Sequence, residues 1–328
     1  MKHLTQEQRY TISVMLQKGF SQTYIAETIG KHKSVISREI KRNADKRTGE
    51  YKAELAQKKY KKRLKEKPRK KKFTDEVQQY VEEKIRDDWS PEQITNRAKL
   101  EGISCVSHER IYQHIWQDKK QGGDLYTHLR SKGKRYRKRG HLKDKRGIIK
   151  NRVSIDERPA IVEKKERFGD FEIDTIIGKN HKGAILTIND RKSSLVWIRK
   201  LNGKNARELA QKTIQTLKGI KNLIHTITGD NGKEFALHQT ISAGLDIQFY
   251  FAHPYHSWER GANENINGLI RQYLPKKTDF QNITQEQLNI IQNKLNNRPR
   301  KKLNYLSPLE FLSNFGILTD ENKVAFTT

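Results

Sequence analysis

The chain is poor in cysteine and in long apolar runs, and each scarcity excludes a class of protein. Cys105 is the only cysteine among 328 residues. One thiol excludes an intrachain disulfide and any zinc site that needs two or more thiolates, and it fits a reducing compartment. No segment approaches the roughly 18 consecutive apolar residues of a membrane span, and the first 30 residues lack a signal peptide's apolar core. We therefore expect a soluble, cytoplasmic protein with no membrane partner.

Acidic side chains are also scarce relative to basic ones. The chain has 67 Lys and Arg against 38 Asp and Glu, for a formal net charge of +29. Residues 1–152 carry 41 basic and 19 acidic side chains, whereas residues 153–328 carry 26 and 19. Such an excess attracts nucleic-acid phosphates through counterion release, with an affinity that falls steeply with salt. The N-terminal half is thus predicted to bind a polyanion.

The first 50 residues predict a helix-turn-helix domain. Thr5, Ser21 and Ser34 are suitable N-caps for three short helices, and Gly30 breaks the second helix. A basic third helix after a tight turn is typical of a recognition helix, which enters the major groove of DNA. The alternative is an ordinary three-helix bundle with a solvated basic face. The predicted DNA contacts are Ser34, Ser37, Arg38, Lys41 and Arg42.

Two basic linkers and a second helical unit follow. Residues 51–72 and 130–160 are predicted linkers that track the DNA backbone, because segments such as 58–72, with 11 basic side chains in 15 positions, hold too much like charge to pack. Residues 73–129 contain Ser90-Pro91-Glu92 and Ser107, which are helix-start signals. We predict a second helix-turn-helix-like unit with His108, Arg110 and Gln113 outward, and DNA contacts from His108 and Arg110. A purely structural bundle is the alternative.

Residues 161–316 predict an α/β domain, followed by a tail at 317–328. β-Branched and apolar runs predict three strands that are followed by alternating helices and strands. This order is typical of an RNase H-like fold, although other α/β folds are compatible with it. The chain is therefore predicted to be multidomain, with helix-turn-helix units before an RNase H-like catalytic domain that has a mixed five-stranded sheet. The predicted strands are 170–177, 184–190, 194–199, 223–228 and 246–251.

Three carboxylates within this domain predict a metal site. Asp174 lies in the first predicted strand, Asp230 ends the fourth, and Glu264 lies on a later helix. Ligand sites in open α/β sheets collect beyond the carboxyl ends of strands. Carboxylates suit Mg²⁺ or Mn²⁺, and two such ions about 3.5–4 Å apart support in-line displacement at phosphorus. We therefore expect two ions per site. Asp170 and Glu172 compete with Asp174, because period-two alternation puts them on the same strand face.

Neighbouring residues carry two further expectations. Arg271 follows Glu264 by seven residues, or about two helical turns, so it is predicted to meet the phosphate of a DNA end. His253 and His256 stand with Tyr255 and Trp258. We expect these four residues to form a loop packed beside the metal site rather than to ligate a metal.

With these residues in view, the chain resembles transposases of the insertion sequence 30 family, within the DDE transposases and integrases. The resemblance covers nearly the whole chain. Asp230-Asn-Gly-Lys-Glu-Phe235 and Asn263-Glu-Asn-Ile-Asn-Gly-Leu-Ile-Arg271 resemble the second and third catalytic blocks, with 33 residues between Asp230 and Glu264. Other similar segments are Ser34-Val-Ile-Ser-Arg-Glu-Ile-Lys-Arg-Asn43, Gly169-Asp-Phe-Glu-Ile-Asp174, Asn297-Arg298-Pro299-Arg300 and Ser307-Pro308-Leu309-Glu310. Phe171 stands where the family typically has Trp, and His253 where it has Asp.

The resemblance implies a function and a set of partners. It places the catalytic, metal-binding acids at Asp174, Asp230 and Glu264. It implies an enzyme that binds the terminal inverted repeats of its own element, exposes a 3′-hydroxyl and joins it to target DNA. Synapsis of two ends implies a homodimer or higher oligomer, associated with the nucleoid of a bacterium.

Two other functions are weighed against this one. A DNA-binding regulator with an inert catalytic fold would use the same helix-turn-helix, but all three acids and Arg271 are present. A nuclease or retroviral-type integrase would share the fold. A retroviral integrase also carries a zinc site of two His and two Cys, which a chain with one cysteine cannot build.

Overall fold

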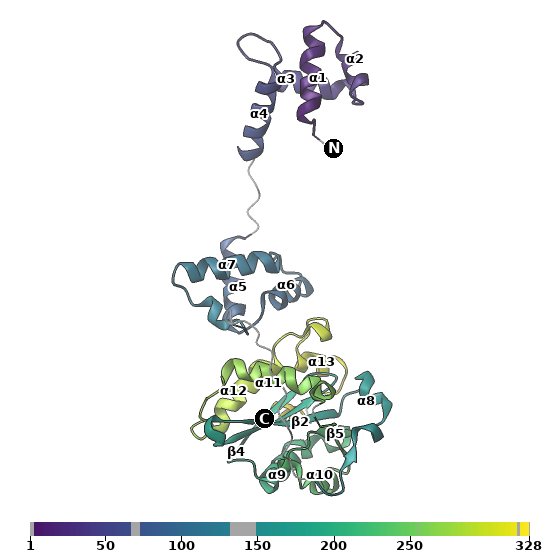
Figure 1. Ribbon diagram of the computed structural model, residues 1–328, viewed down its shortest axis with the longest axis vertical. Coiled ribbons are helices and arrows are strands. Elements are labelled where there is room, and N and C mark those ends of the chain that lie inside the picture. The colour runs from purple at the N-terminus through teal and green to yellow at the C-terminus, as the bar shows by residue number, and fades with distance from the viewer. Residues whose placement is uncertain (1–2, 67–72, 132–148, 255, 320–321, 328) are drawn as a thin grey trace. The chain divides into compact units, whose positions relative to one another are not determined.

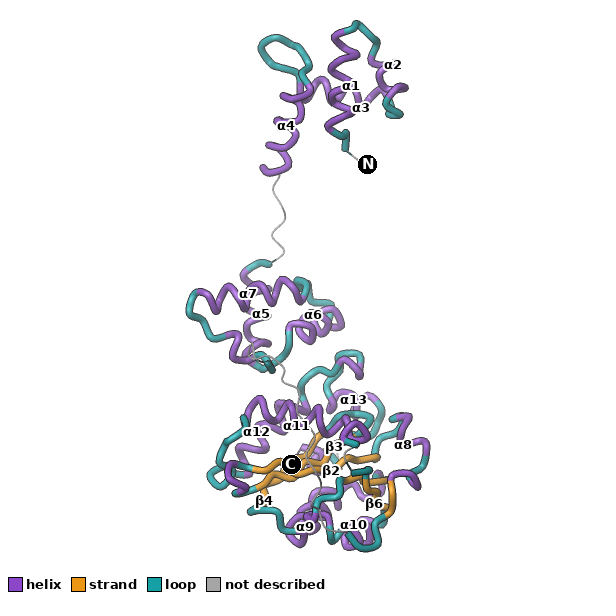
Figure 2. Tube along the Cα trace, in the orientation of Figure 1, coloured by secondary structure: helices purple, strands orange, loops and turns teal. Residues whose placement is uncertain are grey.

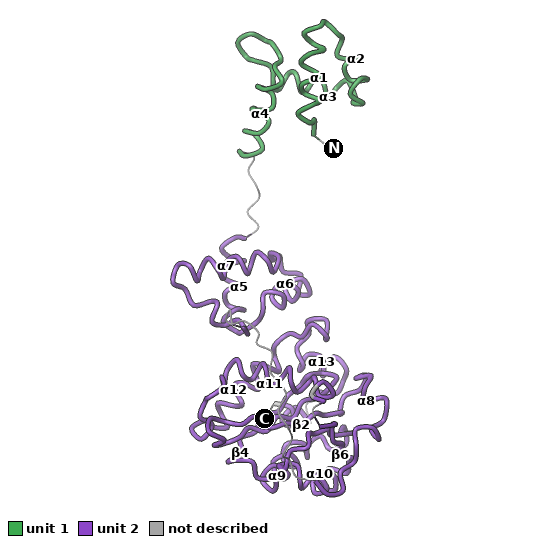
Figure 3. Tube along the Cα trace, in the orientation of Figure 1, with its two compact units in different colours: residues 1–71 green, residues 72–328 purple. Residues whose placement is uncertain are grey.

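The computed structural model describes residues 3–66, 73–131, 149–254, 256–319 and 322–327. The chain divides into two compact units, residues 1–71 and 72–328 (Figure 3). Parts of both predicted basic linkers, residues 67–72 and 132–148, lie outside the described residues. None of the helices described is long and apolar enough to span a membrane.

Unit 1 is a four-helix unit in which local capping signals set the helix starts. Thr5 forms a capping box with Gln8, and the Ser21 hydroxyl accepts from the backbone N–H of Tyr24. The predicted cap at Ser34 is wrong, because His32 takes that position: its backbone is extended and its ring accepts from the Ser34 N–H. The helices are α1 (Gln6–Gln17), α2 (Gln22–Thr28), α3 (Lys33–Asn43) and α4 (Ala53–Glu66).

A small apolar core and one buried ion pair hold the four helices together. Ile12, Ile25, Ile36 and Ala56, one from each helix, are fully buried. The Arg9 guanidinium, also buried, lies 2.8 Å from Glu39 and donates to the carbonyl of Leu4. These contacts attach α1 to α3 and fix the face that α3 leaves exposed.

Unit 2 begins with three helices whose starts follow the sequence signals. Ser90 caps its helix in a capping box with Gln93, Pro91 occupies the first helical position, and Ser107 caps the next helix. The fully buried side chains of Val81, Ile94 and Ile111 centre a separate core. The elements are α5 (Asp75–Arg86), α6 (Pro91–Leu100), α7 (His108–Lys120) and η1 (Leu125–His128).

The remainder of unit 2 is built on a mixed sheet of six strands, in the order β1-β6-β5-β2-β3-β4. Strands β2, β3 and β4 are antiparallel neighbours, whereas β2–β5, β5–β6 and β6–β1 are parallel. The predicted count of five is therefore wrong. The extra strand, β1, has two residues, too few for any periodicity to show. The strands are β1 (Val153–Ser154), β2 (Asp170–Ile177), β3 (Ala184–Asp190), β4 (Val196–Leu201), β5 (Thr226–Gly229) and β6 (Gln248–Phe251).

Helices cover both faces of the sheet, with α11 and α12 on one face and α9 and α10 on the other (Figures 1 and 2). Alternation along β2 sends Phe171 and Ile173 toward α9 and α10, and Ile176 toward α11. Glu172 and Asp174 share the face of Ile176. The helices are α8 (Ala160–Lys164), α9 (Ala206–Leu217), α10 (His238–Leu245), α11 (Gly261–Tyr273), α12 (Gln285–Asn296), α13 (Pro308–Asn314) and α14 (Lys323–Thr327), with short turns η2 (Ile155–Glu157), η3 (Lys179–His181), η4 (Lys218–Leu223), η5 (Lys233–Phe235), η6 (Ser257–Arg260) and η7 (Lys301–Leu303).

The segments at the two ends of unit 2 both pack on its α/β part. Arg97 on α6 forms a bidentate ion pair with Glu310 on α13, with N–O distances of 2.7 and 2.5 Å. Near the C-terminus, Phe326 is fully buried beside Trp197, whose indole N–H donates to the carbonyl of Ala325. Ala325 and Phe326, within the predicted tail, thus contribute to the core.

Candidate active site

Two of the three predicted acids converge on one guanidinium. Asp174 lies within β2, and Asp230 follows the neighbouring parallel strand β5. Arg260, at the end of η6, lies 3.6 Å from Asp174 and 3.7 Å from Asp230. The carboxylates keep 21% and 26% of their side-chain surface exposed. The arrangement is a largely buried pair of carboxylates that shares one cation.

Hydrogen bonds orient both carboxylates. The Asn267 amide on α11 donates to Asp174 at 2.8 Å, and its own oxygen accepts from the Thr187 hydroxyl on β3. The backbone N–H of Gly232 donates to Asp230 at 2.8 Å, closing the turn that the sequence Asp230-Asn231-Gly232 predicts. Each carboxylate is therefore held by its surroundings as well as by Arg260.

Burial makes the charge on Asp174 costly. Desolvation is the main reason that the pKa of Asp174 is raised to about 6; the nearby Asp230 also raises this pKa, whereas Arg260 opposes the shift. Like charges this close resist joint ionisation unless a cation lies between them. The arrangement thus requires positive charge, which Arg260 supplies.

Glu264 lies on the helix face of Arg260 and Asn267 but does not join the pair formed by Asp174 and Asp230. It is exposed in the first turn of α11, four residues after Arg260 and three before Asn267, so all three share a face. Among the described residues, the one set of three acids or histidines close enough to share an ion is His253, His256 and Glu259. Of the predicted trio, Asp174 and Asp230 therefore lie together and Glu264 lies apart from them. Three carboxylates repel one another, and Arg260 occupies the position between the two aspartates.

Arg271 is turned to backbone carbonyls. Its guanidinium donates to the carbonyl of Ile177 at 3.0 Å, and lies at 3.4 Å from those of Leu274 and Pro275. It also lies over the Phe280 ring, and burial lowers its pKa. In this structure Arg271 joins the end of β2 to the end of α11, and phosphate would have to compete with these carbonyls.

Sequence reasoning missed Arg260 and Glu234. Arg260 is detectable from its helical spacing of four and seven residues to Glu264 and Asn267. Glu234 is buried beside the aspartates, where it accepts from the Thr175 hydroxyl at 2.8 Å and pairs with Lys204 at 2.9 Å. Glu234 falls inside the Asp230–Phe235 motif, but its ion pair with distant Lys204 has no local signal.

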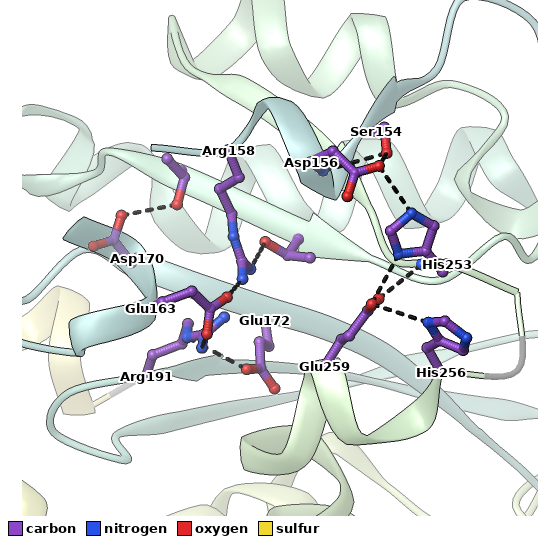
Figure 4. Close-up of polar contacts among 12 residues, drawn as sticks. Ser154, Asp156, Arg158, Glu163, Asp170, Glu172, Arg191, His253, His256 and Glu259 are labelled. Atoms are coloured by element: carbon purple, nitrogen blue, oxygen red, sulfur yellow. Dashed lines mark hydrogen bonds and ion pairs between the residues drawn. The ribbon is translucent and has the colours of Figure 1, made fainter. Parts of the chain in front are cut away.

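The competing carboxylates on β2 have structural partners. Glu172 lies 3.5 Å from Arg191 (Figure 4). It is 1% exposed and also accepts from the backbone N–H of Asn263. Asp170 accepts from the Thr226 hydroxyl and pairs with Arg167. Of the three acids on this strand, Asp174 is the one that faces Asp230.

A charge network of two buried arginines and the exposed Glu163 extends from Glu172. Arg191 pairs with Glu163 at 3.1 Å, and Glu163 also pairs with Arg158 (Figure 4). The Arg158 guanidinium donates to the Thr228 hydroxyl at 2.8 Å. Desolvation and, to a smaller extent, the nearby Arg191 lower the pKa of Arg158 to about 10. The network links α8 to β5.

The predicted DNA-contact residues fall in two groups. Those on α3 are all exposed, and Arg38 folds back on the Ser34 carbonyl at 2.9 Å. On α7, His108 is exposed, whereas Arg110 is half-buried with its guanidinium over the Phe73 ring. The exposed group on α3 comprises Ser34, Ser37, Arg38, Lys41 and Arg42.

Comparisons with known proteins identify the family of this chain. Residues 1–43 match the family model described as a helix-turn-helix domain, which confirms that prediction. The chain is 58% identical to a transposase for insertion sequence element IS4351 from Bacteroides fragilis, over 100% of this chain and 99% of the relative. It is 34% identical to transposase InsI for insertion sequence element IS30C from Escherichia coli (strain K12), over 97% and 85%. The chain therefore belongs to the insertion sequence 30 family of transposases.

Proposed function

We propose that this chain is a DDE-type transposase with an RNase H-like catalytic domain. In this proposal it binds the terminal inverted repeats of its element, and cleaves and joins DNA with Asp174, Asp230 and Glu264. The observation that carries the proposal is the pair Asp174 and Asp230, which meet a shared cation at 3.6 and 3.7 Å. The strand order supports it, because the antiparallel strands β2, β3 and β4 are followed along the chain by β5 and β6, which add in parallel on the other side of β2.

The donor set fits hard divalent cations. Asp174 and Asp230 offer partly exposed carboxylate oxygens and already share one positive charge, and Glu264 adds a third carboxylate from the same face of α11 as Asn267. These residues would hold Mg²⁺ or Mn²⁺, two ions per site. When bound, the ions activate the attacking oxygen and stabilise the leaving oxygen of an in-line displacement.

The chain's own groups orient the reaction. Asn267 and the Gly232 N–H hold the two aspartates, and Arg260 neutralises them before DNA arrives. Nucleophiles are water for cleavage and a DNA 3′-hydroxyl for strand transfer, so no covalent protein intermediate is needed. Synapsis of two element ends requires at least a dimer.

Helix α3 is the proposed reader of the ends. Its exposed face combines hydroxyls with basic side chains, which contact base edges and phosphates in the major groove. Its burial against α1 and α2 through Ile36 leaves that face free within unit 1.

Arg38→Ala should weaken binding to the element's end DNA by roughly 5–150-fold, corresponding to about 1–3 kcal/mol for a lost base-reading arginine. Titration of labelled end DNA at fixed salt, followed by fluorescence anisotropy, measures the loss. Arg47→Ala is the matched control, because Arg47 is exposed in the loop after α3 and off its recognition face. Equal binding by Arg38→Ala and the parent protein would move the recognition surface elsewhere.

The proposed function is tested with full-length protein, a duplex carrying the repeats that flank its coding region, and a target plasmid. With Mg²⁺ or Mn²⁺ we expect nicks that leave a 3′-hydroxyl at the repeat end, followed by joined products. With EDTA we expect binding alone.

Two outcomes would reject the proposal. Binding without cleavage in any divalent metal would leave a DNA-binding regulator. Cleavage that ignores the repeats, on a scrambled duplex of equal length, would indicate a nuclease.

A further inference from the structure

A second set of candidate metal ligands gathers where β6 leads into α11. His253, His256 and Glu259 each offer a ligand atom, and the three atoms lie within 4.8 Å of one another. Figure 4 shows both imidazoles facing the Glu259 carboxylate. The side chains of His253, His256 and Glu259 are 36%, 44% and 19% exposed. A dissolved ion can therefore reach them.

The candidate ligand atoms lie slightly closer together than the ligands of a bound small cation. The Glu259 Oε1 atom lies 2.8 Å from His253 Nδ1 and 3.2 Å from His256 Nδ1. Ligands at the usual zinc bond lengths of about 2.0–2.2 Å stand about 3.3 Å apart in a tetrahedron. A small outward movement of the rings would make room for an ion.

Outer contacts hold each candidate ligand in place. The second ring nitrogen of His253 lies 2.9 Å from the Asp156 carboxylate, and the His253 backbone N–H donates to Glu259 at 2.8 Å. The His256 ring stacks on Trp258, with centroids 4.4 Å apart and planes at 25°. A carboxylate on the far nitrogen of a histidine is the usual outer partner of a metal-ligating imidazole, because it fixes the tautomer and the ring orientation.

We propose that His253, His256 and Glu259 form a structural site for a borderline divalent ion such as Zn²⁺, with Asp156 orienting His253. Two imidazoles and one carboxylate favour Zn²⁺ over Mg²⁺, which prefers oxygen ligands alone. This site is separate from the proposed catalytic site. It is coupled to that site through the chain, because Glu259 immediately precedes the Arg260 that joins Asp174 and Asp230.

A hydrogen bond joins His253 Nδ1 to the Glu259 carboxylate in this structure. The hydrogen bond from Glu259, and then that from Asp156, raises the pKa of His253. Metal binding at His253 Nδ1 displaces the proton of its hydrogen bond to Glu259, while Asp156 keeps the proton on the other ring nitrogen. The site therefore exchanges a proton between His253 and Glu259 for a metal ion.

The experiment titrates Zn²⁺ into metal-free, full-length protein by calorimetry, and Co²⁺ as a spectroscopic probe of nitrogen ligands. We expect one histidine-containing site per chain in the parent and in Asp230→Asn. His256→Gln should bind Zn²⁺ at this site at least tenfold more weakly. Asp156→Asn should weaken Zn²⁺ binding at this site by about 10–100-fold, because loss of an outer carboxylate typically lowers the metal affinity of a protein site by that factor.

His181→Gln is the matched control, because it removes one exposed imidazole from η3 in the same unit and should leave binding unchanged. Parent-like Zn²⁺ binding by His256→Gln would overturn the proposal, as would a parent protein without histidine-type Co²⁺ absorption. Loss of all binding in Asp230→Asn, with His256→Gln unaffected, would assign the ion to the aspartates instead. Far-UV circular dichroism establishes that each variant is folded.

Discussion

Glu264→Gln should lower metal-dependent cleavage at the element's ends by about a thousandfold or more, with DNA binding unchanged. The amide keeps the shape of the side chain but removes the negative charge that would hold a divalent ion. Metal stabilisation of the reacting oxygens is worth several kcal/mol, and each 1.36 kcal/mol changes a rate tenfold. Single-turnover cleavage of end-labelled DNA measures the loss, and anisotropy measures binding.

Glu286→Gln provides the matched control. Glu286 is an exposed glutamate in the first turn of α12, as Glu264 is in the first turn of α11, and it lies outside the proposed catalytic acids. The Glu286→Gln variant should cleave DNA at the same rate as the parent protein. Parent-like cleavage by Glu264→Gln would reject the third acid of the proposed site, while leaving Asp174 and Asp230 to be tested separately.

Arg191→Met should lower the free energy of unfolding by about 3–5 kcal/mol, because it leaves Glu172 charged and buried without its cation. Arg191 and Glu172 side chains are 2% and 1% exposed, so solvent cannot replace the lost partner. Burial already raises the pKa of Glu172, which shows the cost of its charge. Urea denaturation with a constant slope measures the change.

Adding Glu172→Gln should recover part of this loss, because the second change removes the uncompensated charge. Arg207→Met is the control: Arg207 is exposed at the start of α9, and its replacement should alter stability by less than about 0.5 kcal/mol. A double variant whose loss equals the sum of the single losses would contradict the coupling between Arg191 and Glu172.

Much of the local structure was predictable. Ser90-Pro91 and Ser107 mark helix starts that the structure confirms, because a hydroxyl that satisfies nearby backbone N–H groups acts over one turn. The prediction that Ser34 caps α3 was wrong because His32, two residues earlier, offers a competing acceptor and an extended backbone. Periodicity located five strands but missed β1, whose two residues pair with Tyr250 and Phe251 far along the chain.

Residue types and their order were sufficient to predict the helix-turn-helix, the basic half and the candidate acids, because charge, caps and periodicity are properties of short segments. The folded chain alone revealed that Arg260 stands between Asp174 and Asp230, that Glu264 lies outside that pair, and that His253 joins Asp156 to Glu259. Such contacts unite segments tens of residues apart. Their geometry depends on strand order and helix packing, which no local pattern encodes.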